Sequence, residues 1–107
     1  HDTDAARRGT LIEKLSGPHP GKLRIGSPDP AGFDTVSNAS PAGMKPDDAL
    51  PFEIAHLDAA TFVSDVVTKV TPLIEAARRL GCKTSTGIEM FEAETSLMLA
   101  FWLETAA

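Results

Sequence analysis

A short segment of small and polar residues has the composition of a ligand-binding loop. Residues 33–39 are typical of a buried strand, and the chain then runs through Asn38-Ala-Ser-Pro-Ala-Gly-Met44. Small residues let a ligand approach the backbone, and the amide of Asn38 both donates and accepts hydrogen bonds. The end of such a strand forms a ligand crevice in an open α/β sheet. A polar turn after a core strand explains the same residues, so the segment alone leaves both interpretations open.

The other reactive side chains form no recognisable catalytic or metal-binding set. The histidines His1, His19 and His56 are scattered among predicted loops, and none has a partner at metal-ligand spacing, so no metal site is expected. Cys82 follows Gly81, which ends a predicted helix, and is expected to be a small buried hydrophobe rather than a nucleophile. The sequence contains no Gly-x-Gly-x-x-Gly fingerprint.

The composition is that of one ordinary globular domain. The chain has 107 residues, of which 42% are hydrophobic and 23% charged, and its net charge of -5 gives no basic footprint for nucleic acid. A single cysteine excludes an internal disulfide and favours a reducing, cytoplasmic location. No run reaches the roughly 18 apolar residues of a membrane span, and no signal-peptide pattern is present, so we expect a soluble protein without a membrane partner.

Apolar periodicity and turn residues predict alternating helices and strands. Helical patterns cover residues 5–15, 72–80 and 88–105, and a brief helical turn is expected within 52–57. Strand patterns cover residues 23–26, 33–39, 61–67 and 83–86. The run 61–67 is almost continuously apolar, as in a parallel strand that is buried on both faces. Core or domain-packing positions are expected in the last helix at Met90, Phe91, Met98, Phe101 and Trp102.

This alternation predicts an α/β fold with a Rossmann-like, doubly wound and mostly parallel sheet. The first strand and the Gly-rich turn of such a sheet are missing. The chain opens at His1 without a methionine, directly on a helix that Asp2, Thr3 or Asp4 could cap. We therefore expect the chain to be a fragment.

Four motifs, in order and at close to the right spacing, resemble the shikimate dehydrogenase family. They are Val-Ser-Asn-Ala-Ser-Pro-Ala-Gly-Met at 36–44, Asp-Val-Val at 65–67, Thr-Pro-Leu-Ile with Ala-Ala and Gly-Cys within 71–82, and Thr-Gly with Met within 86–90. The resemblance covers nearly the whole chain. It implies that residues 1–107 are the C-terminal part of a dinucleotide-binding domain plus a closing helix.

The resemblance also implies an activity for the complete protein. Members of this family are oxidoreductases of aromatic amino acid biosynthesis, which transfer hydride between NAD(P) and shikimate, quinate or a related cyclic hydroxy acid. Their catalytic Lys and Asp lie in a separate N-terminal substrate domain, which this chain lacks. We therefore expect no catalytic residue here and no activity from the chain alone.

Site residues follow from the same resemblance. The family's contacts with the cofactor fall on Ser40, Pro41, Ala42, Val66, Gly87 and Met90. Its substrate contacts fall on Thr68, where many members carry a Tyr, and on Glu94, where many carry a Gln. A Glu beside a substrate carboxylate would repel it unless it is protonated or paired, so either the substrate differs from shikimate or Glu94 points elsewhere.

The first residues bear on the choice of cofactor. The resemblance makes Asp2 and Thr3 cofactor-binding candidates, with Asp2 where NADP-using members often carry an Arg. A carboxylate accepts hydrogen bonds from ribose hydroxyls and repels a 2′-phosphate, which favours NAD. NADP stays open because Arg7 and Arg8 lie within two turns, and a helix N-cap explains Asp2 about equally well.

The expected partners are a small-molecule substrate and the N-terminal substrate domain of the same protein, and a homodimer is left open. Nucleic acid and membranes are not expected. The departures at Thr68 and Glu94 also support an alternative function. In that alternative, the chain belongs to a non-catalytic dinucleotide-binding sensor or a regulatory relative of the family.

Overall fold

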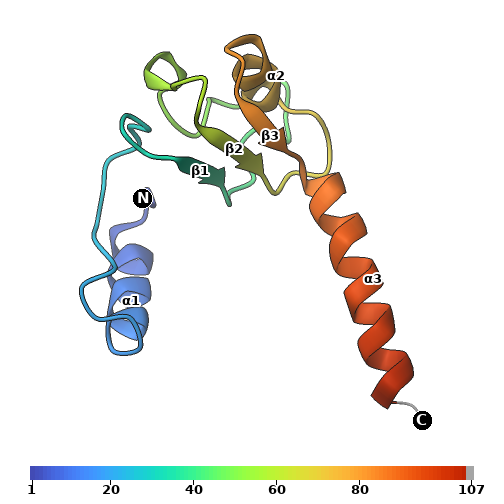
Figure 1. Cartoon of the computed structure of the whole chain (residues 1–107). Coiled ribbons are helices and arrows are strands. Elements are labelled where there is room, and N and C mark those ends of the chain that lie inside the picture. The colour runs from blue at the N-terminus through green and yellow to red at the C-terminus, as the bar shows by residue number, and fades with distance from the viewer. Residues whose placement is uncertain (106–107) are drawn as a thin grey trace.

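The structure is a computed structural model that describes residues 1–105. The elements follow in the order α1 (Ala5–Ser16), β1 (Thr35–Asn38), the 3₁₀ turn η1 (Ile54–His56), β2 (Phe62–Asp65), α2 (Pro72–Arg79), β3 (Lys83–Ser85) and α3 (Gly87–Thr105). The strands form one parallel sheet in the order β1-β2-β3, against which α2 packs (Figure 1). The predicted α/β class with a Rossmann-like parallel sheet is confirmed.

The register of the sheet brings the carboxyl ends of β1 and β2 together. Asn38 and Asp65 are partners across the parallel pair, and each is the last residue of its strand. One further bond extends the pairing, because the Val66 N–H donates to the Asn38 carbonyl at 3.1 Å. The loops after β1 and β2 therefore leave the sheet at one edge, which is where open α/β sheets bind ligands.

Helix α2 covers one face of the sheet because its apolar residues lie on one side. Its buried residues are Leu73, Ile74, Ala76 and Ala77. Thr71 caps the first turn, Pro72 starts the helix, and Gly81 follows its end with a φ of 87°. The core consists of Val63, Leu73, Ala77 and Cys82, with Phe52, Ile54 and Leu57 packed against it. This cluster holds α2 on β2 and β3.

Strand β2 is buried on one face only, so the prediction of a strand buried on both faces is wrong. Val63 and Asp65 are buried, whereas Phe62, the first residue of β2, is 38% exposed. Successive side chains of a strand point to opposite faces, and α2 covers only one of them. On the other face, the hydroxyl of Ser64 donates to that of Ser37 in an exposed hydrogen bond of 2.8 Å.

The strand predicted at residues 23–26 is also absent. These residues have no regular secondary structure and pair with no strand, and Ile25 is 56% exposed. An extended segment becomes a strand only when a neighbour satisfies its backbone hydrogen bonds, which sequence pattern alone does not supply. The segment is instead joined to the N-terminus, where the His1 ring lies 3.1 Å from the Gly26 carbonyl.

Helix α1 begins as predicted but packs little. The carboxylate of Asp4 caps it by accepting from the N–H groups of Ala6 and Arg7 at 2.9 and 3.1 Å. None of its residues is buried. In Figure 1 it lies on the β1 side of the molecule, whereas α3 runs away from the sheet on the β3 side.

The predicted closing helix is present as α3, but its apolar side chains do not pack into the core of this chain. Gly87 is its one buried residue. The apolar side chains expected in the core are exposed: Met90 40%, Phe91 63%, Met98 48%, Phe101 63% and Trp102 58%. They are exposed because the helix projects from the sheet, so their contact with another domain stays a prediction. In the described part of the chain, no helix is both long and apolar enough to cross a membrane.

Candidate functional site

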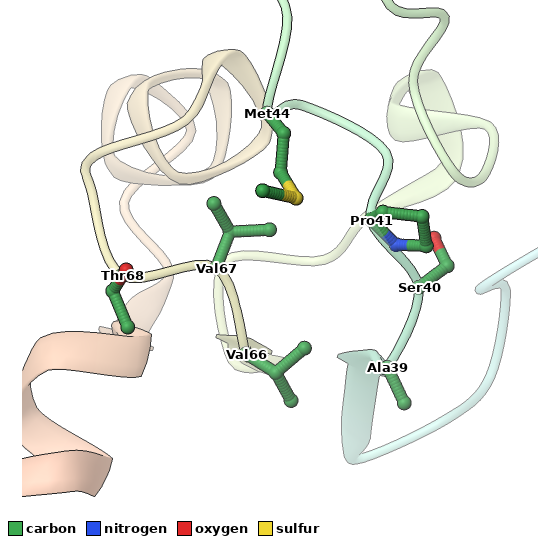
Figure 2. Close-up of a pocket in the computed structure, with 7 residues that line it drawn as sticks. All are labelled: Ala39, Ser40, Pro41, Met44, Val66, Val67 and Thr68. Atoms are coloured by element: carbon green, nitrogen blue, oxygen red, sulfur yellow. The ribbon is translucent and has the colours of Figure 1, made fainter.

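A cavity of about 270 Å³ lies at the edge where β1 and β2 end (Figure 2). The loop after β1 contributes Ala39, Ser40, Pro41 and Met44, and the loop after β2 contributes Val66, Val67 and Thr68. The side chain of Met44 extends toward Val67 in Figure 2. The lining is therefore apolar apart from two hydroxyl groups, and none of its seven side chains is acidic or basic.

Hydrogen bonds of the buried residue Asn38 hold the loop after β1 in shape. The side-chain N–H groups of Asn38 donate to Asp65 Oδ1 at 3.1 Å and to the Ala42 carbonyl at 3.0 Å. The Asn38 Oδ1 accepts from the Ser40 N–H at 3.1 Å and from the Ser40 hydroxyl at 2.6 Å. Asn38 is only 3% exposed. The amide therefore braces the loop, and Asn38 is not among the residues that line the cavity.

The far end of the same loop is closed by Asp48. Its Oδ2 accepts from the N–H groups of Lys45 and Gly43, at 2.9 and 3.0 Å. The bond from Lys45 contributes most, and together the two bonds hold the pKa of the Asp48 carboxyl below its usual value. The carboxyl is therefore ionised at neutral pH. At the rim, the Lys69 ammonium group donates to the Met44 carbonyl and joins the two loops.

The first turn of α3 contacts the loop after β2, which forms one wall of the cavity. The Gly87 N–H donates to the Val67 carbonyl at 3.1 Å. Thr86 and Glu89 cap this turn reciprocally: Glu89 Oε2 accepts from the Thr86 N–H at 2.7 Å, and the Glu89 N–H donates to Thr86 Oγ1 at 3.4 Å. The N–H and then the hydroxyl of Thr86 lower the pKa of the Glu89 carboxyl.

The structure brings four of the predicted site residues to the cavity wall, namely Ser40, Pro41, Val66 and Thr68. Ala42 belongs to the same loop, but its carbonyl is used by Asn38, and Gly87 lies behind Val66 and Val67. Three lining residues were not singled out as site residues: Ala39, Met44 and Val67. Each of them lies inside a motif that resembles the family, and this position could have identified them as candidates.

The other predicted site residues lie away from this cavity. Met90 and Glu94 are exposed on α3 and do not line this cavity, so their contacts with cofactor and substrate stay predictions. Asp2 and Thr3 precede α1 and lie outside the lining as well. The cap of α1 is Asp4, whereas the Asp2 carboxylate accepts from the Asp4 N–H at 2.8 Å.

Cys82 is buried in this structure, as expected from the sequence. It is 7% exposed, and its thiol donates to the Asp58 carbonyl at 3.3 Å. Burial, followed by the negative charge of Asp58, raises the pKa of the thiol, so the reactive thiolate is disfavoured. Across residues 1–105, no three His, Cys, Asp or Glu side chains are grouped closely enough to hold a metal ion.

No family model matches the sequence. The shikimate dehydrogenase (NADP(+)) of Desulfitobacterium hafniense is 33% identical over 76 residues, which are 69% of this chain and only 28% of that protein. A crystal structure of shikimate 5-dehydrogenase from Listeria monocytogenes, in complex with shikimate and NAD, aligns with a TM-score of 0.70 and 28% identity. It covers 84% of this chain and 35% of the Listeria chain. The chain is similar to part of a shikimate dehydrogenase.

A quinate dehydrogenase extends the likeness beyond the shikimate dehydrogenases. The enzyme from Corynebacterium glutamicum, in complex with NAD, aligns with a TM-score of 0.69 and 32% identity over 81% of this chain and 34% of its own. The relatives therefore include shikimate dehydrogenases named for NADP and structures that hold NAD. They support a nicotinamide cofactor without separating the two forms.

Proposed function

We propose that the chain is the C-terminal, nicotinamide-binding part of an oxidoreductase of the shikimate dehydrogenase type. The complete protein transfers hydride between NAD(P) and shikimate, quinate or a related cyclic hydroxy acid. The observation that carries this proposal is the cavity between the loops after β1 and β2, because both loops belong to the motifs that resemble the family. The Listeria relative, which aligns over most of the chain, was solved with shikimate and NAD.

The size and lining of the cavity fit one end of a dinucleotide. Pockets for drug-sized ligands usually measure about 300–1,000 Å³, and this cavity of about 270 Å³ suits a single ring better than a whole dinucleotide. Val66, Val67 and Met44 offer apolar contact to the faces of a ring. The Ser40 and Thr68 hydroxyls and the backbone of both loops offer hydrogen bonds to a carboxamide.

The residues of this chain bind and shield rather than exchange protons. A bound nicotinamide supplies the carbon that accepts or donates hydride. Val66 and Val67 keep water from that carbon, which protects the hydride transfer from side reactions. Because no lining side chain titrates near neutral pH, the acid-base group must come from another part of the protein. This is why we propose a separate substrate domain as the partner of this chain.

The exposed apolar surface of α3 is where we propose that the partner domain packs. Ile88, Phe91, Met98 and Trp102 recur at helical spacing along one side of α3 and are exposed. All charged residues of α3 are glutamates, so a complementary surface carries an apolar groove beside Lys or Arg. Such exposed apolar patches commonly mark interaction sites.

Two measurements test the proposal. The chain is titrated with NADH and NADPH while nicotinamide fluorescence is followed, and binding of at least one is expected. The complete polypeptide in its natural sequence context is then assayed for NAD or NADP reduction with shikimate and with quinate. Turnover with either acid supports the proposal. Failure of all four combinations, with correctly folded protein, rejects the substrate class.

The alternative is a dinucleotide-binding sensor without dehydrogenase activity. The observation in its favour is that the cavity lacks a titrating group and carries Thr68 where many family members have a Tyr. NADH binding by the complete protein, combined with no turnover of any hydroxy acid, is the result that would favour the sensor.

A further inference from the structure

Asp65 directly precedes the lining residue Val66, and both oxygens of its carboxylate accept hydrogen bonds from within the protein. Asp65 is 2% exposed. Its Oδ1 accepts from the Asn38 amide at 3.1 Å and from the Val67 N–H at 3.0 Å, and its Oδ2 accepts from the Thr71 hydroxyl at 2.7 Å. Hydrogen bonds to a charged group are worth about twice those between neutral groups. A buried carboxylate with three donors is therefore a strong local constraint.

These three donors come from three different parts of the site. Asn38 shapes the loop after β1, Val67 belongs to the loop after β2, and Thr71 is the N-cap of α2. Thr71 is completely buried, and it also limits the first loop: a Cβ on Gly43 would lie 3.1 Å from the Thr71 Cβ and Cγ2 atoms. Moving either loop would therefore break a bond to Asp65 or press against Thr71.

We propose that Asp65 is a positioning residue whose carboxylate, through Asn38 and Thr71, fixes the separation of the two cavity walls and so the width of the slot for the nicotinamide ring. The identity of the ligand rests on the proposed function, whereas the bracing rests on the hydrogen bonds alone. A flat ring is held firmly only when the opposing walls are fixed within a fraction of an ångström. Val66 lies on one wall of the cavity and Pro41 on the other (Figure 2).

Two substitutions weaken the network with little change in volume. Asp65→Asn removes the charge and one acceptor, and Thr71→Val removes the hydroxyl while keeping the shape of the side chain. Thr71→Ser is the matched control because it keeps the hydroxyl. Ser64→Ala is a second control: it removes an exposed hydrogen bond from the neighbouring residue on the opposite face of β2. Val63→Ala controls for general destabilisation because Val63 belongs to the core.

The first measurement is amide hydrogen exchange of the ligand-free chain. Exchange of the Ser40 and Val67 amides, which donate to Asn38 and Asp65 respectively, is expected to rise about tenfold in Asp65→Asn and Thr71→Val, as the loss of roughly one charge-assisted hydrogen bond implies. The controls Thr71→Ser and Ser64→Ala leave both rates unchanged. The proposal that Asp65 braces the loops is overturned if these amides exchange equally fast in all variants. It is also overturned if Val63→Ala raises their exchange rates as much as Asp65→Asn does.

The second measurement is the dissociation constant for NADH. It is expected to rise about tenfold in Asp65→Asn and Thr71→Val and to stay within twofold of the wild type in Ser64→Ala and Val63→Ala. Faster exchange with unchanged NADH affinity overturns the role in positioning the ring. If the wild-type chain binds neither NADH nor NADPH, the proposed function fails. The exchange rates of the ligand-free chain then still show whether Asp65 braces the two loops.

Discussion

Gly87 lies so close to the backbone of Val66 that no side chain fits between them. A Cβ placed on Gly87 would be 2.2 Å from the Val66 carbonyl oxygen and 2.6 Å from the Val67 carbonyl oxygen. The start of α3 is thereby pressed onto the wall of the cavity that Val66 and Val67 form. Any residue larger than glycine must displace either the helix or the wall.

This contact predicts a large effect of Gly87→Ala. Because the clash is with backbone, we expect the free energy of unfolding to fall by about 1–3 kcal/mol, the usual cost of overpacking, and affinity for the nicotinamide cofactor to fall with it. Chemical denaturation and NADH titration are the measurements. Gly9→Ala is the matched control, because no atom lies within 4 Å of the added Cβ in α1. Equal stability of the two variants would contradict the contact.

The capping box of α3 predicts a pH dependence. The Thr86 N–H and hydroxyl lower the pKa of Glu89 in the folded state, so its stabilising effect is complete above the ordinary glutamate pKa of about 4.3 and is lost as the pH falls through the lower folded value. At pH 7 the wild type should therefore be more stable to unfolding than Glu89→Gln. This difference in stability should shrink below about pH 4. Circular dichroism during denaturation at several pH values measures it. A pH-independent difference would show that the charge plays no part.

The cofactor preference is tested at Asp2. An Arg at this position would pair with a 2′-phosphate, whereas Asp repels it, so Asp2→Arg should shift the ratio of NADPH to NADH affinity toward NADPH by about tenfold or more. Asp4→Asn is the control, since it removes a charge two residues away and Asn caps α1 as well as Asp does. Tighter binding of NADPH than of NADH by the wild type would refute the role assigned to Asp2.

Apart from the strand expected at residues 23–26, the order of elements and the cavity loops were predictable from the sequence. Pro72 and Gly81 mark the ends of α2, and the apolar residues between them repeat at helical spacing. These are local signals, because the backbone restrictions of proline and glycine do not depend on distant residues. The loop after Asn38 was found for the same reason, and the family's motifs then indicated Ser40, Pro41, Val66 and Thr68.

The errors arose where a residue's partner lies far away in the sequence. Residues 23–26 have the composition of a strand but no neighbouring strand to pair with. Phe62 is apolar and was expected to be buried, yet it is 38% exposed; Trp102, expected in the core or against another domain, is 58% exposed and so lies outside the core of this chain. Whether an apolar side chain is covered depends on which elements meet it, and hydrophobicity alone does not specify that.

The sequence by itself determined most of the elements, their α/β alternation and the loops that line the cavity, because each follows from local backbone preference and apolar period. Only the tertiary structure decided which side chains brace the site. Asp65 had a place in a motif but no assigned role, and its function became visible when the parallel register placed it opposite Asn38 with Thr71 within hydrogen-bond distance. Residues 27 positions apart in sequence meet there because parallel strands align their carboxyl ends, and burial makes every unpaired polar group costly.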